Sequence, residues 1–181
     1  DGDGATVKVS GDVMQWLSVS VSGADVTLSQ SNDLATEVTY TLAGQSSDGS
    51  FTLDGKYKAT VVFNGLDLQS QTGAPVTINN GKRIAVTVSD GTTNTLTDAA
   101  TGSQKACLFI KGHAEFTGSG TLTLVGNAKH AYRSNEYTQL KKKFTGKKRW
   151  VAYVISFLAG ALLCTAIEGG MGLVVNDHYQ L

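Results

Sequence analysis

The chain has 181 residues, of which 41% are hydrophobic and 17% charged, and it contains 21 glycines but a single proline. The length suits one domain with a sizeable core, and the composition excludes a disordered chain and argues against a helical bundle. The net charge of zero conceals a division: residues 1–98 hold eleven acidic and five basic residues (−6), and residues 99–181 hold four acidic and ten basic ones (+6). Such a basic half indicates an anionic partner or simply solvated lysines.

Residues 1–34 are expected to form an N-terminal lead-in and the first strands. From residue 35 to 125 the sequence consists of short apolar alternations, broken by Gly, Asn or Asp, that are too short for helices and rich in β-branched residues. These runs are EVTYTL (37–42), SFTLDG (50–55), TVVFNGLDL (60–68), PVTINNG (75–81), RIAVTVSDG (83–91) and GTLTLVGN (120–127). The pattern predicts strands joined by tight turns.

A weak internal repeat runs through these strands. Residues 74–96 align with residues 106–124, and a fainter copy begins at residue 130. One copy cannot bury its own apolar face, whereas stacked copies can, as in a solenoid. We therefore predict an all-β, right-handed parallel β-helix over residues 35–146, with a β-sandwich as the alternative. Cys107 and the alternating Phe63, Phe109 and Phe116 are expected to be buried.

Sugar-compatible side chains are densest in KHAYRSNEYTQLKKKF (129–144). Tyr132 and Tyr137 offer flat rings to a pyranose, Arg133 a bidentate fork to a uronate carboxylate, and Glu136 an acceptor for hydroxyl groups. We predict these four residues as the carbohydrate-binding site. The alternative is that the segment is a solvated outer edge of one coil.

The last segment, residues 147–181, breaks the Gly-Thr-Val pattern with a basic cluster followed by an uncharged run from Trp150 to Ile167. We expect an ordered apolar cap on the open end of the coil stack, with contact to another chain as a further use of the apolar surface. Two alternatives remain: a tail foreign to the domain, and a membrane anchor over 150–167. The anchor is disfavoured, because the basic residues before it would place the domain in the cytoplasm.

The stretch NGLDLQSQTGAPVTINNGKRIAVTVSDGTTNTLTDA (64–99), with KACLFIKG, GSGTLTLVGN and KHAYRSNEY after it, resembles a family of secreted bacterial carbohydrate-binding β-helix domains. The resemblance covers roughly residues 35–146. It implies a fold similar to that of pectate lyases, non-catalytic binding of a plant-type polysaccharide such as polygalacturonate or a cellulose-like glycan, and a secreted or cell-surface location. It also implies calcium as a cofactor to test, and a polysaccharide rather than a nucleic acid as the partner.

Two other functions are compatible with the same fold: a rigid structural or adhesive surface module, and a polysaccharide lyase-like enzyme. A lyase of this kind needs clustered carboxylates to hold calcium, and a basic residue over the sugar. No Asp stands between Asp98 and Asp177. The nearest aspartates before this gap are Asp67, Asp90 and Asp98. We therefore expect no catalytic residues.

Overall fold

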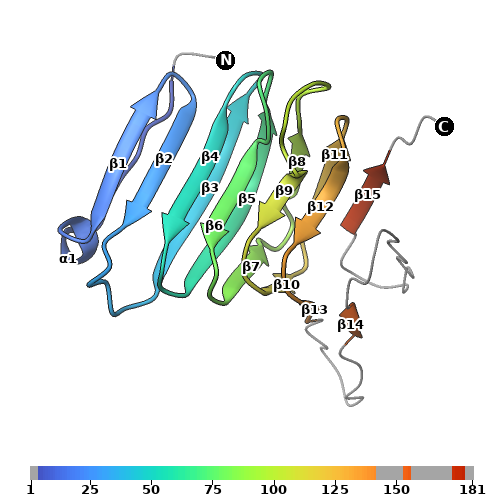
Figure 1. Ribbon diagram of the computed structural model, residues 1–181. Helices are drawn as coiled ribbons and strands as arrows, with labels where there is room; N and C mark the ends of the chain where they lie inside the picture. The colour runs from blue at the N-terminus through green and yellow to red at the C-terminus, as the bar shows by residue number, and fades with distance from the viewer. Residues whose placement is uncertain (1–3, 142–152, 156–172, 178–181) are drawn as a thin grey trace.

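The chain winds into a stack of coils in the computed structural model, which describes residues 4–141, Tyr153–Ile155 and Leu173–Asp177 (Figure 1). One sheet, here called the first sheet, faces the viewer in Figure 1 and has the strand order β1-β2-β4-β6-β9-β12. Its strands are β1 (Leu17–Ser22), β2 (Asp25–Gln30), β4 (Ser50–Gly55), β6 (Val76–Asn80), β9 (Ala106–Ile110) and β12 (His130–Ser134).

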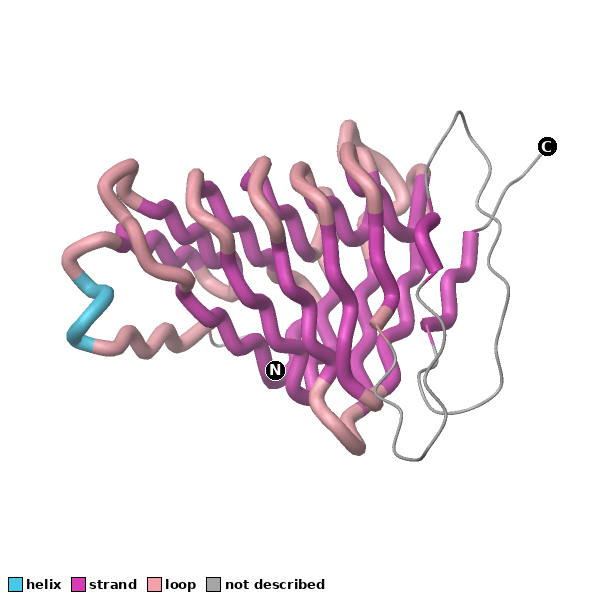
Figure 2. The backbone as a smooth tube through the Cα atoms, turned by 90° about the horizontal axis from the view of Figure 1, so that it is seen from below, coloured by secondary structure: helices cyan, strands magenta, loops and turns pink. Residues whose placement is uncertain are grey.

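The second sheet bends around a corner and supplies two further faces of the stack. Strand β5 makes the bend, because its first half pairs with β7 and its second half, Asp67–Gln69, pairs with β8. The strands of this sheet are β3 (Val38–Ser46), β5 (Ala59–Gln69), β7 (Ile84–Val88), β8 (Thr93–Thr97), β10 (Ala114–Gly118), β11 (Thr121–Gly126), β13 (Thr138–Leu140), β14 (Tyr153–Ile155) and β15 (Leu173–Asp177). Figure 2 shows the coils side by side along the stack, with loops at the corners and the short helix α1 (Gly11–Met14) at one end.

The parallel β-helix prediction is confirmed. Each described coil returns to the first sheet and pairs in parallel with the coil before it, as in β2–β4, β4–β6, β6–β9 and β9–β12. Among the described strands the antiparallel pairs lie only at the two ends of the stack, β1–β2 and β13–β14. The β-sandwich alternative is therefore wrong, since it requires antiparallel pairing throughout.

In-register stacking builds the core as rows of side chains that run along the stack. Alternate residues of a strand point to opposite faces, so one row collects the inward residue of each coil. Phe51, Val76, Leu108 and Tyr132 form one such row, and Leu53, Ile78 and Ile110 form the next. Phe63, Cys107 and Phe116 are buried as predicted.

Asn94 is a buried polar residue that holds the bend of β5 in place. Its Oδ1 accepts hydrogen bonds from the backbone N–H groups of Gly65 and Leu66, both at 2.9 Å. Its Nδ2 donates to the hydroxyl of Thr92 at 3.0 Å and to the carbonyl of Thr121 at 3.1 Å. The side chain thus satisfies backbone groups that the corner removes from the strand ladder.

Close packing between coils requires glycine at Gly118, the last residue of β10. Its φ of 101° lies in a region that residues with a Cβ rarely adopt, and a Cβ there would overlap the carbonyl oxygen of Val88 on the neighbouring coil. The glycine therefore lets the chain turn toward β11 directly against the coil below it.

The coil stack begins earlier than predicted, at Asp25 in β2 rather than at residue 35. The predicted cap or anchor over 150–167 lies outside the described residues, apart from the backbone of β14. The backbone of β15 pairs with β11 in parallel and so continues the face of the second sheet that β8 and β11 form. Within the described part of the chain no helix is long and apolar enough to span a membrane.

Candidate functional site

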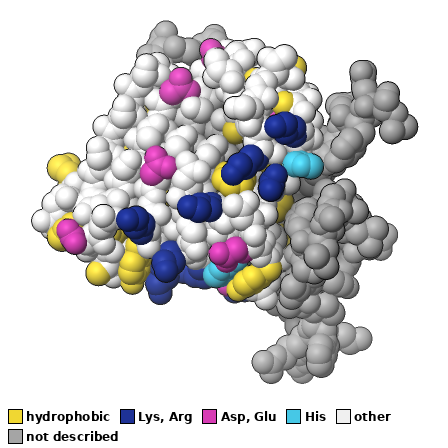
Figure 3. Space-filling model, viewed as in Figure 1, with side chains coloured by type: hydrophobic (Ala, Val, Ile, Leu, Met, Phe, Trp, Pro, Cys, Tyr) yellow, Lys and Arg dark blue, Asp and Glu magenta, His cyan; other side chains and the backbone are white. Residues whose placement is uncertain are grey.

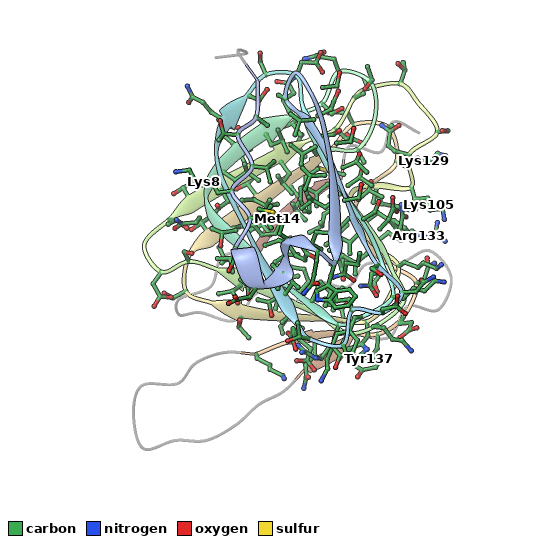
Figure 4. The ribbon with its side chains drawn as sticks, turned by 90° about the vertical axis from the view of Figure 1, so that its left-hand side faces the viewer. Lys8, Met14, Lys105, Lys129, Arg133 and Tyr137 are labelled. Carbon is green, nitrogen blue, oxygen red and sulfur yellow. The ribbon has the colours of Figure 1, made fainter. Side chains whose placement is uncertain are left out.

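The four residues predicted to bind sugar are divided between the core and two outer surfaces. Tyr132 and Arg133 are neighbours on β12 of the first sheet, whereas Glu136 and Tyr137 follow in the turn that leads to β13 of the second sheet. Figure 4 shows Arg133 and Tyr137 projecting from different sides of the corner. The four predicted residues therefore do not form a single cluster.

The prediction that Tyr132 offers its ring to a sugar is wrong. The residue is only 8% exposed and continues the inward row of Leu108. Its ring meets Phe116 edge to face, with centroids 5.5 Å apart, and its hydroxyl lies 2.7 Å from the hydroxyl of Thr138. Because neighbouring residues of a strand point to opposite faces, an outward Arg133 requires an inward Tyr132.

The stability of the fold should depend on pH through Tyr132. Burial raises the pKa of its phenol to about 12, from an ordinary value of 10.0. The neutral phenol is favoured in the folded state, so this contribution is fully present below pH 10 and is lost as the pH rises toward 12. The difference corresponds to about 2 to 3 kcal/mol. Denaturant titrations at pH 9 and 11 should show a larger loss of stability for the wild type than for Tyr132→Phe, and equal losses would contradict the assignment.

Four exposed cations gather on the outer face of the first sheet, and we call Lys105, Lys111, Lys129 and Arg133 the basic patch. Lys105 and Lys129 directly precede the in-register residues Ala106 and His130, so they occupy equivalent positions on adjacent coils. Figure 4 shows Lys105, Lys129 and Arg133 together on one side, and Figure 3 shows basic side chains gathered over this part of the face. Among the described residues none of the four forms an ion pair with an acidic side chain.

Phe109 forms the apolar floor of the basic patch. It stands opposite Arg133 in the β9–β12 register and so points outward, yet it is only 5% exposed. The ammonium group of Lys105 lies 4.7 Å from the centroid of its ring, an attractive cation–π contact that covers it. The floor thus positions one of the four cations of the patch.

The rest of this outer face carries neutral side chains and two aspartates that accept hydrogen bonds from neighbouring neutral side chains. The outward row that ends in Phe109 and Arg133 begins with Thr27, Thr52 and Thr77. Asp25 accepts a hydrogen bond from Ser50 at 2.6 Å, and Asp54 accepts one from Asn79 at 2.9 Å. An anionic ligand on the first sheet would therefore meet acidic groups toward β2 and β4 and unpaired cations toward β9 and β12.

A second group of polar side chains follows the corner between the first sheet and the second. Because the strands that follow are in register, the residue before each strand stacks on its counterpart in the next coil, which gives the row Glu37, Lys58, Arg83, His113 and Tyr137. Arg83 pairs with Glu37, and Lys141 pairs with Glu115 at 2.8 Å. The pKa of Glu37 is lowered, first by its hydrogen bond from Thr60 and then by Arg83.

Tyr137 ends this corner row as an exposed ring on a fixed support. It is 46% exposed and stacks on the imidazole of His113, with centroids 4.6 Å apart and an interplanar angle of 10°. Nδ1 of His113 is 3.8 Å from the Glu136 carboxylate, and Nε2 is 3.9 Å from that of Glu115. Glu136 and Tyr137, which follow one another in the chain, thus lie beside His113 and Glu115 rather than beside Arg133.

The described residues do not fit a carboxylate-rich calcium site. Within residues 4–141, no group of three or more His, Cys, Asp or Glu side chains could hold a metal ion. Asp90 instead accepts hydrogen bonds from the backbone and hydroxyl of Ser119, and Asp98 accepts one from the backbone of Asn127. These carboxylates hold turns.

Sequence reasoning missed Lys105, Lys111, Lys129 and Phe109 as part of the surface that includes Arg133. Phe109 was expected only as a core residue, and the three lysines contributed only to the general basic charge. A signal was present, because Lys105 and Lys129 precede equivalent strands of the repeat. The equivalence of the two lysine positions became visible only once β9 and β12 were aligned by their pairing.

Comparisons with known proteins agree with this fold. A solved structure described as the polysaccharide lyase-like protein from C. thermocellum, gadolinium derivative, superposes with a TM-score of 0.57 at 23% identity, covering 67% of this chain and 51% of that chain. A carbohydrate-binding domain-containing protein of Acetivibrio thermocellus is 28% identical over 130 residues. That alignment covers 66% of this chain and 43% of the relative, so the chain spans less than half the length of the relative.

The family model described as carbohydrate-binding domain-containing protein matches residues 22–145. This range contains the whole coil stack from β2 to β13, including the basic patch and the corner row. The chain therefore belongs to this family of carbohydrate-binding domain-containing proteins.

Proposed function

We propose that the protein is a non-catalytic binding module for an acidic polysaccharide such as polygalacturonate, held through the basic patch on the first sheet. The observation that carries the proposal is the set of four exposed cations without acidic partners among the described residues. A cation without an acidic partner contributes favourable free energy when it binds a carboxylate, whereas a cation in an ion pair must first break that pair.

The arrangement of the patch suits a polymer with regularly spaced carboxylates. Lys105 and Lys129 lie on adjacent coils, which are about 4.8 Å apart, and Arg133 stands beside Phe109 in the same pair of strands. The guanidinium of Arg133 offers parallel N–H donors to one carboxylate, and the lysines act as point charges for others. A polysaccharide partner of this kind is found outside the cell, so we propose that the protein is secreted or attached to the cell surface.

Affinity electrophoresis in gels that contain polygalacturonate tests the proposal. We expect the wild type to be retarded, and retardation to weaken as the salt concentration rises from 0.1 to 1 M, because the screening length falls from about 10 Å to about 3 Å. The triple variant Lys105→Ala/Lys129→Ala/Arg133→Ala should bind at least about tenfold more weakly, which corresponds to about 1.4 kcal/mol. No turnover to unsaturated product is expected in the same incubation.

A matched control separates the patch from overall charge. Lys8 is an exposed lysine on the other side of the molecule from Lys105, Lys129 and Arg133 (Figure 4). Lys8→Ala should leave retardation unchanged, and Arg133→Lys should bind more weakly than wild type because it keeps the charge but loses the planar fork. Failure of the wild type to be retarded would contradict the proposal and favour a structural or adhesive module.

A further inference from the structure

We propose that the corner formed by His113, Glu115, Glu136 and Tyr137 is a second glycan site, separate from the basic patch, that takes an uncharged sugar ring. One molecule would then hold two polysaccharide chains at once. The inference rests on the proposed function, since it assumes a polysaccharide-binding module, but it concerns a different surface and a different chemistry.

The first support is the fixed position of an exposed aromatic ring. Tyr137 presents one face to His113 at 4.6 Å and is 46% exposed, so part of the ring is available to a ligand. Sugars present apolar C–H faces that pack on aromatic rings, and a ring already held in place loses little conformational freedom on binding.

The second support is the way in which the imidazole below the ring is held. His113 is partly buried, with a carboxylate within 4 Å of each ring nitrogen: Glu136 at 3.8 Å from Nδ1 and Glu115 at 3.9 Å from Nε2. Glu115 is held in turn by Lys141 at 2.8 Å, and Arg83 lies 3.9 Å from it. His113 is therefore a positioning residue that fixes the plane of Tyr137.

The third support is charge, which distinguishes this corner from the basic patch. The two cations nearest to Glu115 have acidic partners, since Arg83 pairs with Glu37 and Lys141 pairs with Glu115. Lys58 of the same row lies three coils away from Tyr137 and contacts the ring of Tyr57. The carboxylate of Glu136 is half-exposed, so it can accept hydrogen bonds from the hydroxyl groups of a sugar, but it would repel a uronate. The corner therefore favours a neutral sugar ring, and the basic patch an ionised one.

The fourth support is the separation of the two surfaces. Arg133 lies on the outer face of the first sheet, and Tyr137 lies beyond the turn where the second sheet begins. Figure 4 shows the two side chains on different sides of the corner, with Lys105 and Lys129 on the side of Arg133. Two glycan chains on adjacent faces do not need to share space.

A ternary-binding experiment tests the inference. Protein is captured on immobilised polygalacturonate and then exposed to a labelled, neutral β-glucan oligosaccharide. We expect the oligosaccharide to be retained without eluting the protein. Tyr137→Ala should lower its affinity about tenfold while leaving capture on polygalacturonate unchanged, and Tyr137→Phe should behave as the wild type.

The positioning role of His113 needs its own variants. His113→Ala should weaken binding of the neutral oligosaccharide several-fold. His113→Phe should bind the oligosaccharide as tightly as the wild type, because a flat ring is still present below Tyr137. In NMR titrations with the same oligosaccharide, the ring protons of Tyr137 and His113 should shift in the wild type.

The outcomes separate this inference from the proposed function. Elution of the captured protein by the oligosaccharide would show one shared site and overturn the inference, as would a wild type that does not bind the oligosaccharide in solution. Either result leaves retention on polygalacturonate as an independent measurement. Loss of that retention with intact, Tyr137-dependent oligosaccharide binding would overturn the acidic-polysaccharide proposal while supporting the corner site.

Discussion

Tyr132→Ala is expected to lower the free energy of unfolding by about 3 to 5 kcal/mol, as replacement of a large buried aromatic residue does. The substitution removes a ring that packs on Phe116 in the last described coil, and it leaves the hydroxyl of Thr138 without its partner. The affinity of the remaining folded protein for polygalacturonate should be unchanged. Denaturant unfolding followed by circular dichroism measures the first quantity, and titration under folding conditions measures the second.

Two variants provide the controls for this prediction. Tyr132→Phe keeps the ring and loses one buried hydrogen bond, so we expect a loss of about 1 kcal/mol. Tyr137→Ala removes an exposed tyrosine from the same segment and should change the free energy of unfolding by no more than about 0.5 kcal/mol. A stable Tyr132→Ala protein with weakened sugar binding would show that Tyr132 contacts the ligand after all.

Asn94→Leu is expected to destabilise the protein by about 1 to 3 kcal/mol, although leucine has the same branched shape as asparagine and is more hydrophobic. The reason is that the buried N–H group of Leu66 loses its acceptor, at the cost of one buried unsatisfied group, while the N–H group of the exposed Gly65 can turn to water. The carbonyl of Thr121 loses a donor as well. Equilibrium unfolding in urea gives the magnitude.

Asn79→Leu is the matched control, because Asn79 is an exposed asparagine on the outer face of the first sheet. Its amide donates one hydrogen bond, to Asp54 at 2.9 Å, and both groups remain accessible to water when that bond is lost. We expect a change of no more than about 0.5 kcal/mol. Equal losses for Asn79→Leu and Asn94→Leu would contradict the role assigned to Asn94 in the corner.

The fold could be predicted from the sequence because its signals are local. Short alternations such as RIAVTV and TLTL specify strands with one buried side, and the Gly, Asn and Asp residues between them specify turns. The first coil was placed too late, because β2 precedes the polar stretch 31–37 and pairs with β4 only after a long connection. Alternation identifies a strand, but it does not identify the strand with which it pairs.

The candidate site was harder to predict, because it depends on which residues the coils bring together. His113 and Tyr137 are 24 residues apart (137 − 113), as are Lys105 and Lys129 (129 − 105), and both pairs become neighbours only through the β10–β13 and β9–β12 registers. The placing of Tyr132 beside Arg133 on one surface was an error that alternation alone could have prevented. To place Tyr137 beyond the corner, one would also need to know where the chain turns between β12 and β13, which alternation does not reveal.

The in-register rows make the coils equivalent to one another as supports for surface residues. The outer positions of the first sheet and of the corner recur once per coil, and the inward rows are mostly apolar, although the row of Leu53, Ile78 and Ile110 ends in the buried Ser134. An additional coil would therefore extend both proposed glycan surfaces by one position without a change in the packing of the others. In such an architecture the length of polysaccharide that is held and the stability of the domain both increase with the number of coils, whereas the chemistry of each contact is set by single outward residues.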